Sequence, residues 1–294
     1  MDKIIDGKLI SEQIKKEIAA EVAAMIDHGK NAPHLAAVIV GEDGASQTYV
    51  ASKEKACHSV GMTSSVYRFP ERTTEEELLK TVEFLNNDPE IDGYIIQLPL
   101  PKHINEDRII NAINPAKDVD GFTSINVGRL QLGLPCFVPA TPNGIMELIK
   151  RSGIETVGKN VVVLGRSNIV GTPMAILMSR KGIDATVTLC HSRTKDIASI
   201  TRQADIIVVA IGKQAFLTAD MVKPGAVVID VGIHRVEDTS SPKGYKIVGD
   251  VEYEGVSQIA SKITPVPGGV GPMTIVSLLQ NTLKAAKGVV YPKP

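Results

Sequence analysis

Two side chains with acid–base chemistry, Tyr49 and Lys53, lie four residues apart in the segment YVASK. On a helix this spacing places both side chains on one face. An apolar, buried setting lowers the pKa of a lysine, so a neutral Lys53 could accept or pass a proton near neutral pH. For an isolated YxxxK, a solvated lysine beside a half-buried tyrosine is the more common arrangement. The pair therefore needs further polar partners before it indicates catalysis.

Two other segments offer such partners. Gln97 ends an apolar stretch just before Leu98-Pro99, and a primary amide can hydrogen-bond an amine in either protonation state. Asp118 and Asp120 lie in KDVDGF, directly before a glycine. A carboxylate at such a turn can accept hydrogen bonds from two N–H groups on the edge of an aminopyrimidine-type ring. An Asx-type turn is an equally common use of these residues.

The segment TPVPGGVGPMT at 264–274 combines three prolines with three glycines. Proline restricts φ, and glycine allows backbone angles that are closed to other residues, so together they specify one backbone shape. Bare backbone can approach a ligand closely there. A rigid connection between a strand and a helix explains the same composition equally well.

The first 140 residues alternate between helical and strand patterns. Apolar residues at helical spacing predict a helix over about 10–26, and Thr73 with Glu76 predicts a capping box for the third helix. This alternation predicts an α/β domain. The predicted helices are 10–26, 46–60, 73–85 and 105–113, and the predicted strands are 34–40, 64–69 and 92–98.

A second α/β series follows a hinge-like segment at 139–142, where Thr141 can cap a helix with Pro142 at its first position. We predict two domains separated by a cleft: residues 1–140 plus 273–294, which bind substrate, and a Rossmann-like domain over 141–272. The strands expected in the second series are 161–164, 186–190, 205–211, 226–231, 245–248 and 263–264, and the helices are 171–180, 194–203 and 273–286.

The stretch VVVLGRSNIVG at 161–171 has the order strand, glycine turn, helix, which suits a pyrophosphate. Its spacing is not GxGxxG, so the glycines alone are a weak dinucleotide signal. The end of the next strand lacks the acidic residue that usually holds the ribose of NAD. Arg166, Ser192 and Arg193 could together hold a 2′-phosphate, which favours NADP over NAD. Alternatively, these three residues are exposed polar loop residues that bind no cofactor.

Composition limits the classes of function. The 294 residues include 32 Lys plus Arg and 33 Asp plus Glu, so we expect no bulk attraction to nucleic acid or membrane. Cys57, Cys136 and Cys190 are far apart, which favours a reducing compartment over a disulfide framework. The six histidines have no metal-ligand spacing, so no metal is expected. The N-terminus lacks an apolar signal region, and we expect a cytoplasmic protein.

Taken together, these motifs resemble one family over nearly the whole chain: the bifunctional methylenetetrahydrofolate dehydrogenase/methenyltetrahydrofolate cyclohydrolases of the FolD type. YxxxK also occurs in short-chain dehydrogenases, but there the glycine turn comes first, whereas here YVASK precedes it. Ala140 departs from the family, since many relatives have Cys there, and we expect little effect on chemistry. The segments that carry the resemblance are 49–57, 95–101, 117–122, 165–173, 185–194, 225–233, 249–251 and 264–274.

The resemblance implies roles for individual residues. Lys53 would be the catalytic lysine, Gln97 would tune it, Tyr49 would position the folate and Asp120 would anchor the pterin. Other expected substrate contacts are Leu98, Pro99, Pro267, Gly268 and Gly271. The expected NADP contacts are Gly165, Arg166, Ser167, Ile169, Val170, Gly171, His191, Ser192, Arg193, Ala210, Gly212, Val231, Gly232 and Ile233. The family is typically a homodimer joined through the cofactor domain.

The implied chemistry is oxidation of methylenetetrahydrofolate by NADP, followed by hydrolysis of the methenyl product to formyltetrahydrofolate. Hydride transfer releases no proton, whereas the hydrolysis needs a group such as Lys53 that handles protons. Three alternatives remain: another two-domain dehydrogenase of the shikimate or amino-acid type, a dehydrogenase without the hydrolase, and a binding protein without turnover.

Overall fold

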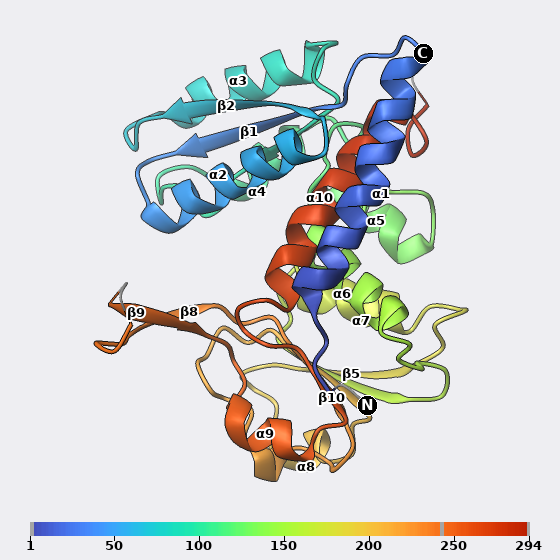
Figure 1. Ribbon diagram of the computed structural model, residues 1–294. Coiled ribbons are helices and arrows are strands. Elements are labelled where there is room, and N and C mark those ends of the chain that lie inside the picture. Colours follow the sequence, from blue (N-terminus) through green and yellow to red (C-terminus); the bar gives the residue numbers. More distant parts are fainter. Residues whose placement is uncertain (1–2, 242–243, 293–294) are drawn as a thin grey trace. The chain divides into compact units, whose positions relative to one another are not determined.

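The computed structural model describes residues 3–241 and 244–292 and shows an α/β chain with two compact units (Figure 1). The three-stranded unit comprises Glu12–Ala140 and the residues from Ile275 onward. The five-stranded unit comprises the residues up to Ser11 and Thr141–Thr274. The expected two-domain α/β class with parallel sheets is confirmed.

The first residues of the chain differ from the expected division. We expected them in the first domain, but residues 3–11 pack with the five-stranded unit. The reason is backbone pairing, because Ile5 N–H donates to the Ile263 carbonyl (2.8 Å) and Lys8 N–H to that of Gly268 (2.9 Å).

The smaller sheet has the order β2 (Thr63–Phe69), β1 (His34–Val40), β3 (Gly93–Ile96), and all its strands are parallel. The central strand β1 is an apolar run in which Leu35 to Val40 are buried, as a strand covered on both faces requires. Its bounds are those predicted. Because the strands are parallel, their carboxyl ends meet at one edge of the sheet.

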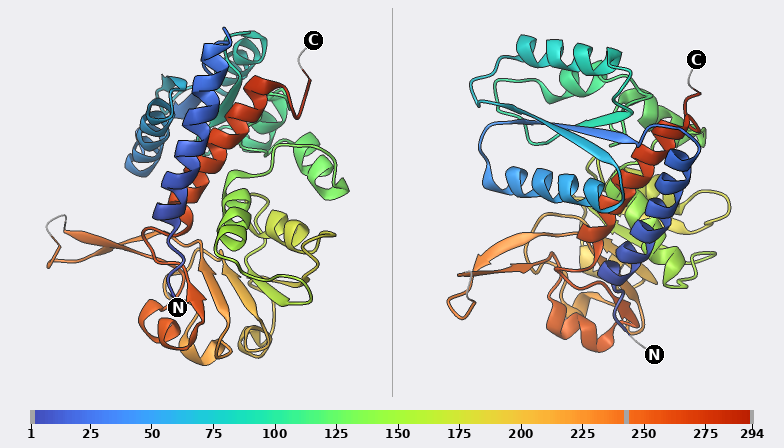
Figure 2. Two further views of the ribbon diagram at one scale, coloured as in Figure 1. Left: turned by 45° about the vertical axis from the view of Figure 1, so that its right-hand side comes forward. Right: turned by 45° about the horizontal axis from the view of Figure 1, so that its top comes forward.

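Helices cover both faces of this sheet (Figures 1 and 2). Helix α2 (Gly44–Ser59) covers one face, and α3 (Glu75–Asn87) and α4 (Glu106–Ala112) bury Leu78, Val82 and Ile109 against the other. Helices α1 (Gly7–Asp27) and α10 (Val270–Lys287) lie side by side, with Lys287 paired to Glu21. Helix α5 (Ser124–Leu132) was not expected from the sequence.

Three helix starts differ from the predictions. The capping box of α3 uses Thr74 and Glu77 instead of Thr73 and Glu76, since the helix begins one residue later. Helix α6 (Ala140–Arg151) begins before Thr141, whose hydroxyl pairs with that of Thr274 (3.0 Å) instead of capping. Helix α10 begins three residues early, because a proline is tolerated in a first turn that lacks N–H partners.

The larger sheet has the order β10 (Lys262–Ile263), β7 (Val227–Asp230), β6 (Ile206–Val209), β4 (Asn160–Leu164), β5 (Thr186–Cys190), and every neighbouring pair is parallel. After β5 the chain crosses to the other side of β4 and forms β6. The sheet order therefore reverses between β4 and β6, and ligands approach such sheets at the carboxyl ends of the strands beside that reversal.

The remaining elements of the five-stranded unit are short. Helix α7 (Gly171–Met178) follows β4, and α8 (Ile197–Thr201) is shorter than predicted because Asp196, at φ 46°, caps it by accepting from Ser199 N–H. A 3-10 turn at Ala219–Met221 and α9 (Tyr253–Ile259) complete the set. Strands β8 (His234–Glu237) and β9 (Tyr245–Val248) form an antiparallel hairpin that extends away from the sheet (Figure 2); only the second of them was expected.

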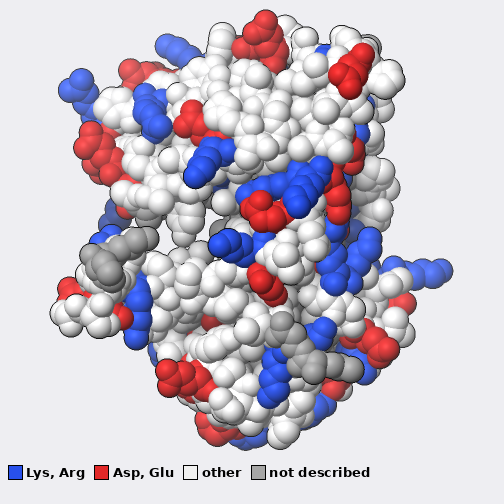
Figure 3. Space-filling view, viewed as in Figure 1, with Lys and Arg blue, Asp and Glu red and all other residues white. Residues whose placement is uncertain are grey.

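Charges of both signs are interspersed on the face shown in Figure 3. Among the helices of the described residues, none is long and apolar enough to span a bilayer.

Candidate active site

Lys53 and Gln97 meet at the carboxyl edge of the three-stranded sheet. Lys53 lies on α2, and its Nζ donates to Gln97 Oε1 (3.1 Å). Gln97 directly follows β3, where its own N–H donates to the Val38 carbonyl (2.8 Å). The side-chain amide of Gln97 also donates to the Leu98 carbonyl (2.7 Å), which turns its oxygen toward Lys53. The two residues predicted to share the acid–base chemistry are thus brought together.

The segment carrying Asp120 runs beside β3. Tyr94 N–H donates to the Lys117 carbonyl (3.0 Å), and Tyr94 bridges Asp118 in parallel register. Gly93 permits this approach, because a Cβ there would collide with the Val119 side chain. Sheet pairing and a close glycine contact therefore place Asp120 at the same edge as Lys53.

The two carboxylates of this segment have different surroundings. Asp118 is buried and accepts from the N–H groups of Phe122 (3.1 Å) and Thr123 (2.8 Å) and from Asn126 Nδ2 (2.8 Å). Asp118 therefore forms the Asx-type turn, which the sequence alone could assign to either Asp118 or Asp120. Asp120 accepts no hydrogen bond from the described residues, which leaves its carboxylate available to a ligand.

Burial and charge shift the pKa values of Lys53 and Asp120 in opposite directions. Burial lowers the pKa of Lys53, and the nearby charge of Asp120 partly opposes this shift. Burial raises the pKa of Asp120 to about 6, although the Lys53 charge lowers it; Asp118 raises it further. Both shifts favour the uncharged forms, so Lys53 is better suited to accept a proton near neutral pH than an ordinary lysine is.

The other predicted substrate residues fall into two groups. Tyr49 lies one turn before Lys53 on α2 and is 41% exposed, and the half-buried Leu98 is joined to the exposed Pro99 by a cis peptide bond. Pro267, Gly268 and Gly271 belong to the other unit. There the Gly268 carbonyl accepts from Lys8 N–H, and a Cβ at Gly271 would have no atom within 4 Å.

The predicted cofactor residues follow the carboxyl ends of four neighbouring strands. Gly165 N–H donates to the Cys190 carbonyl (3.0 Å), Ala210 N–H to that of Leu164 (2.8 Å) and Val231 N–H to that of Val209 (2.9 Å). These bonds join the loops after β5, β4, β6 and β7 into one edge. The predicted residues on it are Gly165, Arg166, Ser167, Ile169, Val170, Gly171, His191, Ser192, Arg193, Ala210, Gly212, Val231, Gly232 and Ile233.

The turn after β4 is compact and rich in free donors. Gly165 has φ 112°, and a Cβ at Gly171 would collide with the Gly165 carbonyl oxygen. Ser167 Oγ accepts from Val170 N–H (3.2 Å). Within the described residues, the N–H groups of residues 166–169 have no hydrogen-bond acceptor. A row of free N–H groups before a helix fits the phosphates of a dinucleotide.

The residues directly after β5, at 191–194, include no acidic side chain that could hold a ribose, and Asp196 beyond them caps α8. Ser192 and Arg193 are exposed, as is Arg166 after β4, and neither guanidinium is ion-paired with a described residue. Asp184 lies before β5, where its carboxylate accepts from Gly182 N–H (3.0 Å). These residues fit the additional phosphate of NADP.

Sequence models of one family match both parts of the chain. The tetrahydrofolate dehydrogenase/cyclohydrolase catalytic domain matches residues 5–120, and the NAD(P)-binding domain of the same family matches residues 139–290. The chain is 60% identical to "Bifunctional protein FolD" of Bacteroides fragilis over 290 residues, which is 98% of this chain and 99% of that protein. This chain belongs to the tetrahydrofolate dehydrogenase/cyclohydrolase family.

Solved structures of family members agree with this assignment. The bifunctional enzyme FolD from Campylobacter jejuni is 49% identical with a TM-score of 0.92, and the match covers 97% of this chain and 99% of that one. The Trypanosoma brucei enzyme, solved with NADP cofactor and an inhibitor, is 42% identical with a TM-score of 0.92, and the match covers 98% of each chain. Family membership decides against the shikimate or amino-acid dehydrogenase alternative.

Sequence reasoning missed a pair of buried aspartates beside the cofactor residues of this family member. Asp250 Oδ2 accepts from the N–H groups of Ile211 and Gly212 (2.8 Å each), and its Oδ1 lies 2.7 Å from His234 Nε2. Asp230 accepts from the N–H groups of Gly232 (2.9 Å) and Val251 (3.0 Å). The carboxylates therefore hold the loops after β6 and β7. The signal available in the sequence was Asp250, which directly follows a glycine in the segment GDV at 249–251.

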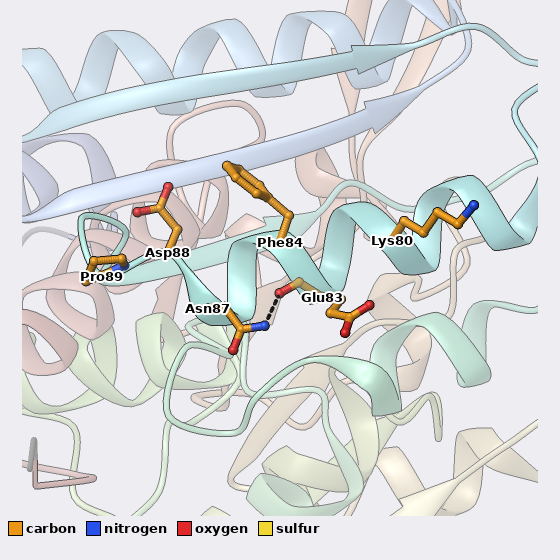
Figure 4. A pocket seen from close by; sticks show the side chains of 6 residues that line it. All are labelled: Lys80, Glu83, Phe84, Asn87, Asp88 and Pro89. Atoms are coloured by element: carbon orange, nitrogen blue, oxygen red, sulfur yellow. Dashed lines mark hydrogen bonds between the residues drawn. The ribbon is translucent and has the colours of Figure 1, made fainter.

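A surface hollow on α3 contains none of the site residues. Figure 4 shows its lining by Lys80, Glu83, Phe84, Asn87, Asp88 and Pro89. Phe84 is 56% exposed and contacts the Tyr67 ring edge-on. In the part of the chain that the structure describes, no group of three acidic, histidine or cysteine side chains is arranged to hold a metal ion.

Proposed function

We propose that this chain is a bifunctional folate enzyme: an NADP-dependent methylenetetrahydrofolate dehydrogenase and a methenyltetrahydrofolate cyclohydrolase. Its family membership supports both activities. The observation that carries the catalytic assignment is the hydrogen bond from Lys53 Nζ to Gln97 Oε1, next to Asp120.

NADP supplies the acceptor for the hydride of the first reaction. That reaction releases no proton, so the chain's own residues contribute orientation, which can lower a barrier by several kcal/mol. Asp120 would accept N–H groups of the pterin, and Tyr49 would contact the folate ring. Arg166, Ser192 and Arg193 would hold the 2′-phosphate, and the free N–H groups after β4 would hold the pyrophosphate.

The second reaction needs proton transfer, which we assign to Lys53. Water attacks the cationic methenyl carbon, a C–O bond forms, and the proton lost from the water passes to neutral Lys53. The carbon–nitrogen bond then breaks, and the departing nitrogen takes a proton from the Lys53 ammonium. The hydroxyl group loses its remaining proton to the regenerated amine as the carbonyl forms, which gives formyltetrahydrofolate, and Lys53 releases that proton to solvent. Gln97 Oε1 accepts a hydrogen bond from either form of the amine, so Lys53 stays in place throughout.

The test begins with the wild-type protein. NADP⁺ reduction with methylenetetrahydrofolate and accelerated decay of added methenyltetrahydrofolate, both followed by absorbance, would establish the two activities. Reduction without accelerated decay would leave a dehydrogenase alone. Absence of both signals would favour the binding-protein alternative.

Lys53→Met is the test of the catalytic assignment. It keeps much of the side-chain volume but cannot carry a proton, so we expect cyclohydrolase activity to fall by about 10²-fold or more. Dehydrogenase activity should remain measurable, because that step needs no base. Equal loss of both activities in a folded variant would contradict the assignment.

We further propose a cytoplasmic homodimer. The family resemblance supports the dimer, and the buried thiols of Cys57 and Cys190, neither of which forms a disulfide with a described residue, support a reducing compartment. Sedimentation of the purified protein at twice 31.4 kDa is the expected result for the dimer.

A further inference from the structure

The loop that carries Asp120 is fastened by a side chain from the C-terminal helix. Asn281 on α10 is 0% exposed, and its Nδ2 donates to the carbonyl oxygens of Val119 (2.8 Å) and Val138 (2.9 Å). Val119 directly precedes Asp120. The side-chain amide of Asn281 therefore connects the backbone next to Asp120 with a second backbone strip around residue 138.

The residue after Asp120 is held by the same strip. Gly121 has φ 72°, and a Cβ there would lie 2.5 Å from the Phe137 carbonyl oxygen and 2.9 Å from Pro139 N. Asp120 thus lies between a hydrogen-bonded residue and a tightly packed glycine. A displacement of the 137–139 strip would move the carboxylate. Asn281 bonds a backbone carbonyl in each strip, whereas Asn126 joins the strips through the Asp118 carboxylate (2.8 Å) and Phe137 N–H (3.3 Å).

The other buried polar side chains of α10, Ser277 and Thr282, do not share this role. Thr282 donates to the Leu278 carbonyl of its own helix (2.9 Å), while Ser277 Oγ has no hydrogen-bond partner within the described residues. Asn281 Oδ1 also lacks a partner there. The two N–H groups of the Asn281 amide therefore account for the polar contacts of this side chain.

We propose that Asn281 is a positioning residue for the folate reaction: it sets the place of the Asp120 carboxylate through the Val119 and Val138 carbonyls. The proposal rests on the proposed function, in which Asp120 binds the pterin. It assigns to α10 a part in substrate recognition through a residue that touches neither the substrate nor Lys53. Loss of its two hydrogen bonds should weaken folate binding and leave NADP binding unaffected.

The test uses Asn281→Leu, which has similar volume and no donor. We expect the KM for methylenetetrahydrofolate and the Kd for tetrahydrofolate to rise by about fivefold or more, with the KM for NADP within about twofold of wild type. Thr282→Val and Ser277→Ala are matched controls, since both remove a buried hydroxyl from the same helix. Both should keep the wild-type folate KM whatever they do to the melting temperature.

Several results would overturn the proposal. These are a folded Asn281→Leu variant with unchanged folate KM, an equal change in the KM for NADP, or the same folate effect in either control. If Asn281→Leu does not fold, Asn281→Ser retains one donor and should give a smaller increase in folate KM, whereas an unchanged value would exclude the role. Calorimetric binding of tetrahydrofolate does not depend on turnover, so it separates failure of this proposal from failure of the proposed function.

Discussion

Lys53 and Asp120 form a pair in which each side chain affects the charge of the other. Burial favours the neutral form of each, and the attraction between their charged forms opposes this effect. The balance matters for the proposed hydrolysis, because only the neutral amine can take a proton from water. The opposite arrangement, a fully charged and solvated lysine, would bind anions but would be a poor base.

The pH dependence of the cyclohydrolase should reflect Lys53. We expect activity to rise with pH at lower pH than the ordinary lysine pKa of 10.5 would allow, because burial lowers the pKa of Lys53 and so increases the neutral fraction of the amine. Asp120→Asn removes a charge that raises the Lys53 pKa, so the rise should shift to lower pH at saturating folate. An unchanged midpoint in this variant would mean that the two side chains are not coupled.

Cofactor choice should depend on Arg166. The exposed guanidinium has no ion-pair partner among the described residues and can approach a 2′-phosphate that NAD lacks. We expect Arg166→Ala to raise the KM for NADP by about tenfold and the KM for NAD by less than about threefold. Lys181→Ala, which removes an exposed charge from the loop before β5, is the control. Parallel changes for both cofactors would remove Arg166 from the phosphate site.

At the scale of elements, the turn between β4 and α7 depends on close backbone packing. Gly165 lies against the Ala210 carbonyl at the end of β6, and Gly171 lies against Gly165 itself. The first turn of α7 is therefore held against the strand end, beside the N–H groups that have no acceptor among the described residues. A single methyl group at either glycine would separate these elements.

Gly171→Ala should weaken both folding and NADP binding. The added Cβ would collide with the Gly165 carbonyl oxygen, so we expect a loss of about 2–3 kcal/mol in the free energy of unfolding. Gly128→Ala on α5 is the matched control, because nothing lies within 4 Å of its Cβ position and a helical alanine should stabilise by about 0.5–1 kcal/mol. Denaturant unfolding of both variants checks this; destabilisation of similar size in both would contradict the packing argument.

For the molecule as a whole, Asp120 links stability to pH. Its folded-state pKa of about 6 is above the ordinary value of 3.8, so the folded protein holds this proton more tightly than the unfolded chain does. Its contribution to stability is therefore full below about pH 4 and is lost as pH rises through about 6. The partly exposed position of Asp120 limits the effect to about 1–2 kcal/mol.

Asp120→Asn should remove this component, because the amide does not titrate. We expect the variant to gain stability relative to wild type as pH increases from about 4 to about 7, measured as the difference between their urea midpoints. A constant difference over this range would show that Asp120 has an ordinary pKa in the folded protein.

Local sequence was sufficient for the elements whose signals are strong and continuous. The apolar run at 34–40 is a strand with the predicted bounds, because a strand buried on both faces needs nearly every residue to be apolar. The run at 186–190, in which threonines alternate with apolar residues, is an edge strand with the predicted bounds. The order of the motifs along the chain was enough to indicate the family, and the YxxxK spacing placed Tyr49 and Lys53 one helical turn apart. Helix starts were less well predicted, since the signals at 73–77 and 139–142 allow more than one first residue.

Tertiary structure decided which residues meet. Only the pairing of 117–118 beside β3 separates the turn-forming Asp118 from the available Asp120, since both are equally plausible in sequence. Asn281 and Asp250 bond backbone groups that are distant in the chain, and no local pattern marks such a partner. Propensity and periodicity report on near neighbours, whereas the hydrogen bonds that hold these loops satisfy buried groups brought together only when the chain is folded.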